Sequence, residues 1–263
     1  MYNTILTEIK GSNFWITINR ADKMNALNIE TLQEIKQAVE TANANDQVLC
    51  IFLTGAGEKA FAAGADISEF ADFSEEEGTK MAAEGHAVMF TIEQSRQPVI
   101  ALVNGFTLGG GCELAIACHL RIASENARFG QPEVNLGLVP GYGGTQRLCD
   151  IVGKGRAMEI LMTGDAIKAP RAYEIGLVNY VVPIENLYEK GEELARTIAG
   201  KSPKAIRSVI ECVNAHYAKD IDGFNYEITR FGKSFSTDDF KEGTQAFLQK
   251  RKPDFRNAES FSS

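Results

Sequence analysis

Residues 103–113 read VNGFTLGGGCE, an apolar strand that runs into three consecutive glycines and a glutamate. The next residues, ELAIA at 113–117, have the composition of a short buried helix. Glycine lets the backbone approach a ligand closely, and the first N–H groups of a helix have no partner within the helix. The stretch therefore predicts a strand-to-helix turn that forms an anion hole beside Glu113. A tight turn with close packing is the alternative for glycines 109–111.

A second glutamate follows twenty residues later in another Gly-rich context. Residues 129–133 read FGQPE, and residues 139–147 read VPGYGGTQR. Taken singly, Glu113 could merely complement a helix dipole, and Glu133 could be a surface loop residue after Pro132. Two such glutamates in neighbouring Gly-rich loops favour a catalytic pair.

Composition limits the classes of function. The chain has 263 residues, of which 44% are hydrophobic, so it can bury a large core. Its net charge of −8 disfavours a nucleic-acid partner, since the one dense basic run is KRK at 250–252. Five cysteines without CxxC spacing favour a reducing compartment. No membrane span or signal peptide is evident, and we expect a cytoplasmic protein.

Strand and helix patterns alternate over the first two thirds of the chain, which predicts an α/β fold. Four helical segments then follow one another. The strands are expected at 14–18, 48–54, 98–103, 120–123 and 177–182, and the helices at 28–42, 76–95, from 110, 145–151, 156–162, 185–199, 203–217, 221–235 and 238–250. We expect a core at residues 1–200, with the site, and a helical region at residues 201–263.

Further blocks extend the pattern along the chain. They are INR at 18–20, NAL at 25–27 and FAAGADI at 61–67. With the two Gly-rich loops, these blocks resemble the crotonase superfamily, and within it the enoyl-CoA hydratases, in order and spacing. The sequence departs from the family at His119, where an acidic residue is usual. A role of that acidic residue in the family is therefore not transferred to this chain.

The resemblance implies a particular architecture, in which ββα units stack as a spiral and C-terminal helices form a lid and make trimer contacts. Pattern alone does not distinguish this spiral from a doubly wound sheet. The resemblance also implies a homotrimer or homohexamer.

The implied reaction is the reversible syn addition of water to a trans-2-enoyl-CoA, which gives a 3-hydroxyacyl-CoA in fatty-acid degradation (β-oxidation) or a related pathway. By resemblance, the backbone N–H groups of Ala65 and Gly110 form the oxyanion hole. Glu113 corresponds to the residue that activates water at Cβ, and Glu133 to the one that exchanges the proton at Cα.

Two rival functions stay open. An isomerase of the same family needs one proton shuttle and commonly lacks a carboxylate at the position of Glu113, so the presence of both glutamates favours hydration. Another crotonase-family acyl-CoA enzyme is also possible. A non-enzymatic acyl-CoA-binding or RNA-binding homologue is disfavoured by the intact glutamates and the acidic charge.

Coenzyme A is expected only as part of the substrate, and no other cofactor is expected. No metal ion is expected either, since no group of residues has the spacing of metal ligands. No GxSxG elbow is present either. By resemblance, two segments hold the coenzyme A. A C-terminal pair reaches the coenzyme A that is bound to a neighbouring subunit. The implied residues are Lys23, Met24, Ala63, Ala65, Asp66, Ile67, Phe247 and Lys250. Phe247 and Lys250 lie three residues apart and are expected on one helical face, so both can meet the same cofactor. Lys23 could instead be a solvated turn lysine, and the pair could be an ordinary amphipathic helix end.

Overall fold

The core of the protein is a six-stranded sheet. The computed structural model describes residues 2–256. Its strand order is β1-β2-β3-β5-β7-β10. Strand β1 runs antiparallel to β2, and the remaining pairs are parallel. The bounds are β1 (Ile5–Lys10), β2 (Asn13–Ile18), β3 (Cys50–Gly55), β5 (Val99–Val103), β7 (Leu120–Ser124) and β10 (Tyr180–Val182). Every residue of β3 and β5 is buried, as expected for parallel strands covered on both faces.

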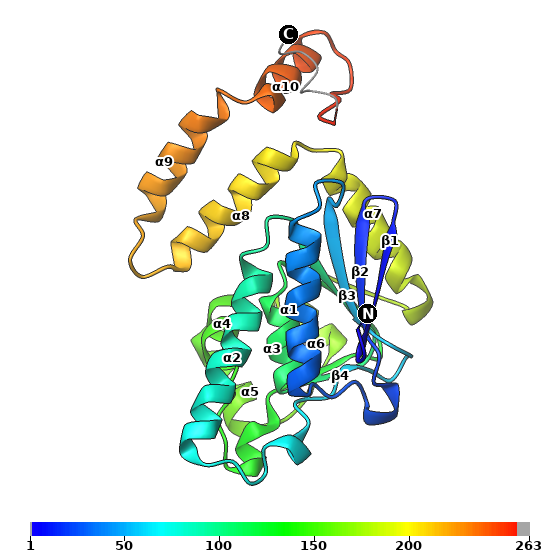
Figure 1. The fold of residues 1–263 in the computed structure, drawn as a ribbon, viewed down its shortest axis with the longest axis vertical. Helices are drawn as coiled ribbons and strands as arrows, with labels where there is room; N and C mark the ends of the chain where they lie inside the picture. The colour runs from blue at the N-terminus through cyan, green and yellow to red at the C-terminus, as the bar shows by residue number, and fades with distance from the viewer. Residues whose placement is uncertain (1, 257–263) are drawn as a thin grey trace.

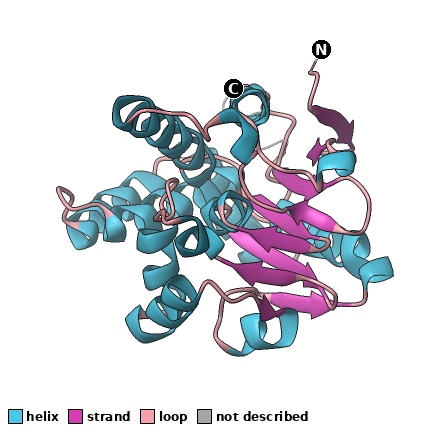
Figure 2. Cartoon of the chain, turned by 90° about the horizontal axis from the view of Figure 1, so that it is seen from below, coloured by secondary structure: helices cyan, strands magenta, loops and turns pink. Residues whose placement is uncertain are grey.

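A smaller sheet explains why the chain is a spiral rather than a doubly wound sheet. It has the order β4-β6-β8-β9, with β4 (Ala60–Ala62), β6 (Phe106–Leu108), β8 (Arg128–Gly130) and β9 (Ile167–Lys168). In three successive turns, which begin at β3, β5 and β7, the chain adds one strand to the large sheet, then one to the small sheet, and then a helix. The predicted ββα spiral is confirmed. Figure 2 shows the helices around the strands of the sheet.

Six helices pack around the sheets, and their starts agree with the sequence. The Asn28 side chain accepts a hydrogen bond from Thr31 N, so it caps the first helix as its position predicts. Ser74 and Glu77 form a capping box at the second. The helices are α1 (Ile29–Asn43), α2 (Glu75–Glu93), α3 (Gly110–Ala117), α4 (Gly144–Val152), α5 (Lys154–Thr163) and α6 (Ala169–Glu174). Short 3-10 turns are η1 (Ala21–Lys23), η2 (Ile67–Glu69), η3 (Pro132–Leu136) and η4 (Ile184–Asn186).

Four helices end the described chain: α7 (Leu187–Ala199), α8 (Pro203–Tyr217), α9 (Gly223–Ser234) and α10 (Asp238–Leu248). Helix α7 contacts β3, β5 and β7. Helices α8 to α10 extend from the core as an arm (Figure 1). The division near residue 200 stays a prediction. Within residues 2–256, no helix combines the length and apolar composition that crossing a bilayer requires.

Several details differ from the sequence-based expectations. The last helix ends at Leu248, and Lys250 follows with a left-handed φ of 56°. Lys250 and Phe247 therefore do not share a helical face. At the start of that helix, Asp239 is buried and accepts a hydrogen bond from Ser202 Oγ. The strand expected at 177–182 begins only at Tyr180.

Candidate active site

The turn before α3 has the geometry that its three glycines predict. Gly109 has φ 48° and ψ −125°, a conformation that disfavours any residue with a side chain. A Cβ atom on Gly109 would lie 2.9 Å from Glu133 Oε1. The missing side chain therefore leaves room for the second glutamate at the start of the helix that carries the first.

The two predicted oxyanion donors lie next to each other. A Cβ atom on Gly110 would be 3.6 Å from Ala65 N. Gly110 opens α3, where an N–H group has no acceptor within the helix. Ala65 is held by Leu27, whose N donates to Gly64 O and whose O accepts from Asp66 N, each at 2.8 Å. This pair of backbone donors fits a binding site for a developing oxyanion.

Glu113 is a buried carboxylate fixed by the second Gly-rich loop. Its side chain is 1% exposed, and Oε1 accepts hydrogen bonds from Tyr142 N and Gly144 N, both at 2.7 Å. Burial raises the pKa of Glu113 to about 7, although the two N–H donors oppose this rise. The negative charge of Glu133 also raises it. A carboxyl group with this pKa can hold or release a proton near neutral pH.

Glu133 lies in the first turn of η3 and is only partly buried. Burial raises the pKa of this carboxyl too, while its own backbone N–H lowers it. The Gln131 side chain is buried, and when its amide nitrogen is assigned to the side that faces Glu133, it donates to Oε1 at 3.0 Å and to Oε2 at 3.2 Å. The structure thus brings both glutamates to one place with the Ala65 and Gly110 donors.

The Tyr142 ring closes this site on one side. A Cβ atom on Gly110 would lie 3.3 Å from Tyr142 Cε2, and one on Gly85 of α2 would overlap the ring. The ring therefore lies between α2 and α3, and its hydroxyl oxygen is buried without a hydrogen-bond partner in the described structure. Sequence reasoning did not single out Tyr142, Gly144 or Gln131. Their position inside the Gly-rich motifs was the available signal.

The two predicted coenzyme A segments lie side by side. Ala63 N donates to Met24 O at 3.1 Å, next to the Leu27 contacts with the same loop. Asp66 forms an ion pair with Arg20 at 2.8 Å, which ties the segments together. The hydrogen bond from the Ser68 hydroxyl, and after it the one from Arg20, lowers the pKa of Asp66. Lys23 is exposed in η1, and Ile67 is 47% exposed. Both remain available to a ligand.

The C-terminal pair does not join this site within one chain. Phe247 is 83% exposed on α10, and Lys250 follows that helix. Figure 1 shows α10 at the top of the molecule, away from α3. A role for this pair in coenzyme A binding would require a neighbouring subunit, as the sequence comparison implies.

His119 has a structural position. Its Nδ1 accepts from Val99 N at 2.9 Å, and its Nε2 lies 3.0 Å from Glu93 O. Both contacts are satisfied by a neutral ring that carries its proton on Nε2. Burial lowers the pKa of His119 and favours this neutral form. The residue that replaces the usual acidic one thus connects β5 to the end of α2.

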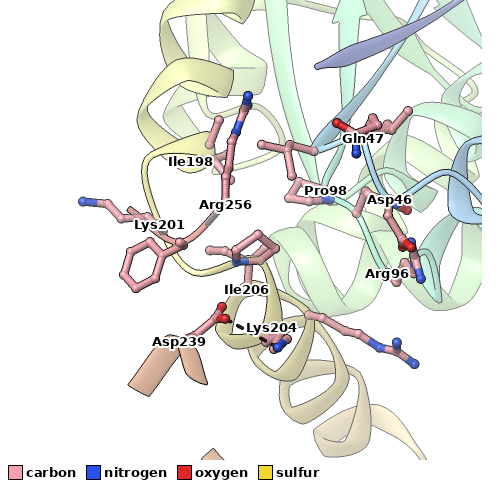
Figure 3. Close-up of a pocket in the computed structure, with 17 residues that line it drawn as sticks. Asp46, Gln47, Arg96, Pro98, Ile198, Lys201, Lys204, Ile206, Asp239 and Arg256 are labelled. Carbon is pink, nitrogen blue, oxygen red and sulfur yellow. Dashed lines mark hydrogen bonds and ion pairs between the residues drawn. The ribbon is translucent and has the colours of Figure 1, made fainter. Parts of the chain in front are cut away.

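A cavity of about 550 Å³ lies elsewhere, between the core, the start of α8 and the C-terminal residues around Asp239 and Arg256 (Figure 3). It contains none of the predicted site residues. Its cations include Arg96, paired with Asp46, and Lys204, 3.7 Å from Asp239. Lys201 points away from the others. The charges do not converge, so the candidate site is the one at α3. In residues 2–256, no three His, Cys, Asp or Glu side chains gather as a metal site would require.

Known proteins match the chain over nearly its full length. The model of the enoyl-CoA hydratase/isomerase family matches residues 8–258. The short-chain-enoyl-CoA hydratase of Clostridium acetobutylicum is 46% identical over 95% of this chain and 96% of its own. The crotonyl-CoA hydratase of Syntrophomonas wolfei is 47% identical, over 97% and 98%.

A solved structure has the same fold. The crystal structure of an enoyl-CoA hydratase from Bacillus anthracis superimposes with a TM-score of 0.91 at 39% identity. The match covers 97% of this chain and 99% of that one. From its sequence and its fold, the chain belongs to the enoyl-CoA hydratase/isomerase family of the crotonase superfamily.

Proposed function

We propose that this protein is an enoyl-CoA hydratase that adds water reversibly, with syn geometry, to a trans-2-enoyl-CoA. The observation that carries the proposal is the pair of carboxyl groups, Glu113 and Glu133, at the Ala65 and Gly110 N–H groups. Coenzyme A belongs to the substrate in this reaction. No separate cofactor is proposed.

The thioester oxygen accepts from the Ala65 and Gly110 N–H groups, which stabilise the negative charge that develops as water adds to Cβ. Glu113, held by Tyr142 N and Gly144 N, takes a proton from that water. Glu133, next to Gly109, gives a proton to Cα. Hydration starts with one carboxylate and one carboxylic acid. Dehydration starts with these protonation states exchanged.

An isomerase is the second candidate, because the family model covers both activities. Moving a double bond requires a base that shuttles one proton and no activated water. The two hydrogen bonds to Glu113 fix a second carboxylate in the site. Hydration needs this second carboxylate and isomerisation does not, so the arrangement favours hydration.

A short acyl chain is the preferred substrate in this proposal. Two similar proteins carry the names short-chain-enoyl-CoA hydratase and crotonyl-CoA hydratase. The Tyr142 ring supports the same preference, because it fills the space between α2 and the turn at Gly110. A longer chain would have to displace it or take another route.

The experiment is direct. The conjugated enoyl thioester absorbs in the ultraviolet, and its absorbance falls when water adds. Purified protein is mixed with trans-2-enoyl-CoA of four to ten carbons. We expect rapid loss of absorbance with four carbons, a 3-hydroxyacyl-CoA product, and falling rates with length. A shifted double bond without water uptake would instead identify an isomerase.

We also propose that the protein assembles as a homotrimer or a dimer of trimers in the cytoplasm. Helices α8 and α9 carry large apolar side chains at the surface of a single chain, which a water-soluble monomer rarely exposes together. They include Val209, Val213, Phe224, Ile228 and Phe231, each more than half exposed. Light scattering on a dilute sample tests this. A monomer with full activity would contradict the assembly.

A further inference from the structure

An ion pair outside the predicted catalytic set connects α2 to the loop that holds Glu113. Arg147 of α4 is 8% exposed. Its Nη2 lies 2.9 Å from Glu93 Oε2, and its Nε lies 3.4 Å from Glu93 Oε1. The guanidinium is also 5.0 Å from the centre of the Phe90 ring. Two residues of α2, one turn apart, therefore fix its position.

The same guanidinium holds the loop directly. Arg147 Nη1 donates to Tyr142 O at 3.0 Å. The N–H of Tyr142, on the other side of the same residue, donates to Glu113 Oε1. The next donor, Gly144 N, opens the helix that carries Arg147. Both hydrogen bonds to Glu113 thus come from a segment that Arg147 fastens to α2.

The loop backbone is shaped around this side chain. Gly143 lies between the two donors and has φ 101°. A Cβ atom there would overlap Arg147 Nη1. Glycine at this position is thus needed both for the backbone conformation and for the guanidinium. A surface ion pair contributes little, but the Arg147 side chain is buried, pairs with Glu93 through two hydrogen bonds and makes a third to Tyr142 O. Loss of this guanidinium would therefore release the loop from α2.

We propose that Arg147, oriented by Glu93, is a positioning residue for the water-activating carboxylate Glu113. It makes no hydrogen bond to Glu113 or Glu133 and acts through Tyr142 and Gly144, while its positive charge also lowers the pKa of Glu113. Glu133 is held by Gln131 instead, so Arg147 serves one half of the reaction. This proposal rests on the proposed hydratase function and on its division of roles.

The test compares two reactions of the same enzyme. Hydration of a four-carbon enoyl-CoA requires both glutamates. Exchange of the Cα hydrogen of butyryl-CoA in heavy water requires Glu133 alone, because no water adds. For Arg147→Gln we expect hydration kcat to fall roughly 10- to 100-fold, as for a misplaced catalytic group. We expect KM and the exchange rate to stay within about twofold.

Graded variants separate positioning from folding. Arg147→Lys keeps the charge but cannot make the three directed bonds, so it should restore only part of kcat. Glu93→Gln leaves the bond to Tyr142 O and should cost less than Arg147→Gln. Arg96→Gln is the matched control, because it removes another ion pair, to Asp46, just beyond the end of α2. It should leave both reactions unchanged. Thermal melting of each variant verifies folding.

The outcomes are distinguishable. If folded Arg147→Gln loses hydration and exchange equally, or retains full hydration, the positioning role is wrong. If the wild-type protein does not hydrate the substrate, or Glu113→Gln itself loses both reactions equally, the proposed function or its division of roles fails instead.

Discussion

The segments that carry the two glutamates solve the same problem in different ways. Glu113 lies in a helix whose eight residues are all buried, and its carboxylate is fixed by backbone N–H groups. Glu133 lies in a short 3-10 turn in which no residue is fully buried. The carboxylate of Glu113 is buried and held in one orientation, so it can position one water molecule for attack. The carboxylate of Glu133 is closer to solvent and can exchange its proton.

The largest effect should come from Glu133→Gln. Glutamine keeps the size of the side chain but cannot transfer the proton at Cα. Hydration should fall by at least about 100-fold, the scale of one lost acid or base. The exchange at Cα should fall equally, as mass spectrometry of butyryl-CoA in heavy water would measure. Survival of exchange would reverse the roles of the two segments.

Gly109→Ala should have a smaller effect than the loss of either glutamate, but it disturbs both segments at once. The new Cβ would lie 2.9 Å from Glu133 Oε1, in a backbone conformation that L residues avoid. We expect kcat to fall about tenfold or more, with a loss of stability of ~1–3 kcal/mol. Gly137→Ala, also at a positive φ but with open space around it, is the control for strain alone. It should lower stability without a comparable loss of kcat.

The burial of Glu113 should appear in the pH dependence of stability. Its pKa of about 7 in the folded state exceeds the ordinary 4.5, so the folded protein retains a proton that the unfolded chain releases. This contribution to stability is complete below pH 4.5 and is lost as the pH rises through 7.

Between pH 5.5 and 8, the free energy of unfolding of the wild type should therefore fall by roughly 2 kcal/mol relative to Glu113→Gln. Denaturant titrations of both proteins at the two pH values measure this difference. An equal pH dependence would show that Glu113 is not the buried titrating group.

Lys250→Ala should have the smallest effect on turnover. If Lys250 meets the phosphates of coenzyme A in a neighbouring subunit, KM for the enoyl-CoA should rise several-fold with kcat nearly unchanged. A pantetheine thioester without the nucleotide should not respond. Lys252→Ala, which removes another exposed lysine of the same run, is the control. Equal responses of the two substrates would make Lys250 a solvated lysine.

The sequence predicts the long elements well, because their apolar patterns are local. The cap at Asn28, the strand at Val99–Val103 and the helix Pro203–Tyr217 all agree with the structure. The three-residue strands of the small sheet carry no periodic signal. They exist only because β4, β6 and β8 meet in the folded chain. The sequence pattern alone could not predict them.

The candidate site shows the same division between local and long-range information. The Gly-rich turn at Gly109 and the choice of the two glutamates follow from motifs. The contacts that hold Glu113 come from residues 29 and 31 positions away, and the Arg147–Glu93 pair spans 54. Pairings of this kind depend on the packing of α2, α3 and α4, which no local pattern encodes.

The most direct test is the separation of the two reactions in Glu113→Gln. Hydration of a four-carbon enoyl-CoA and Cα exchange of butyryl-CoA are measured on the same folded sample. The account predicts that hydration falls at least about 100-fold while exchange stays within a few-fold of the wild type. Hydration near the wild-type rate, or a parallel loss of both reactions, would contradict it.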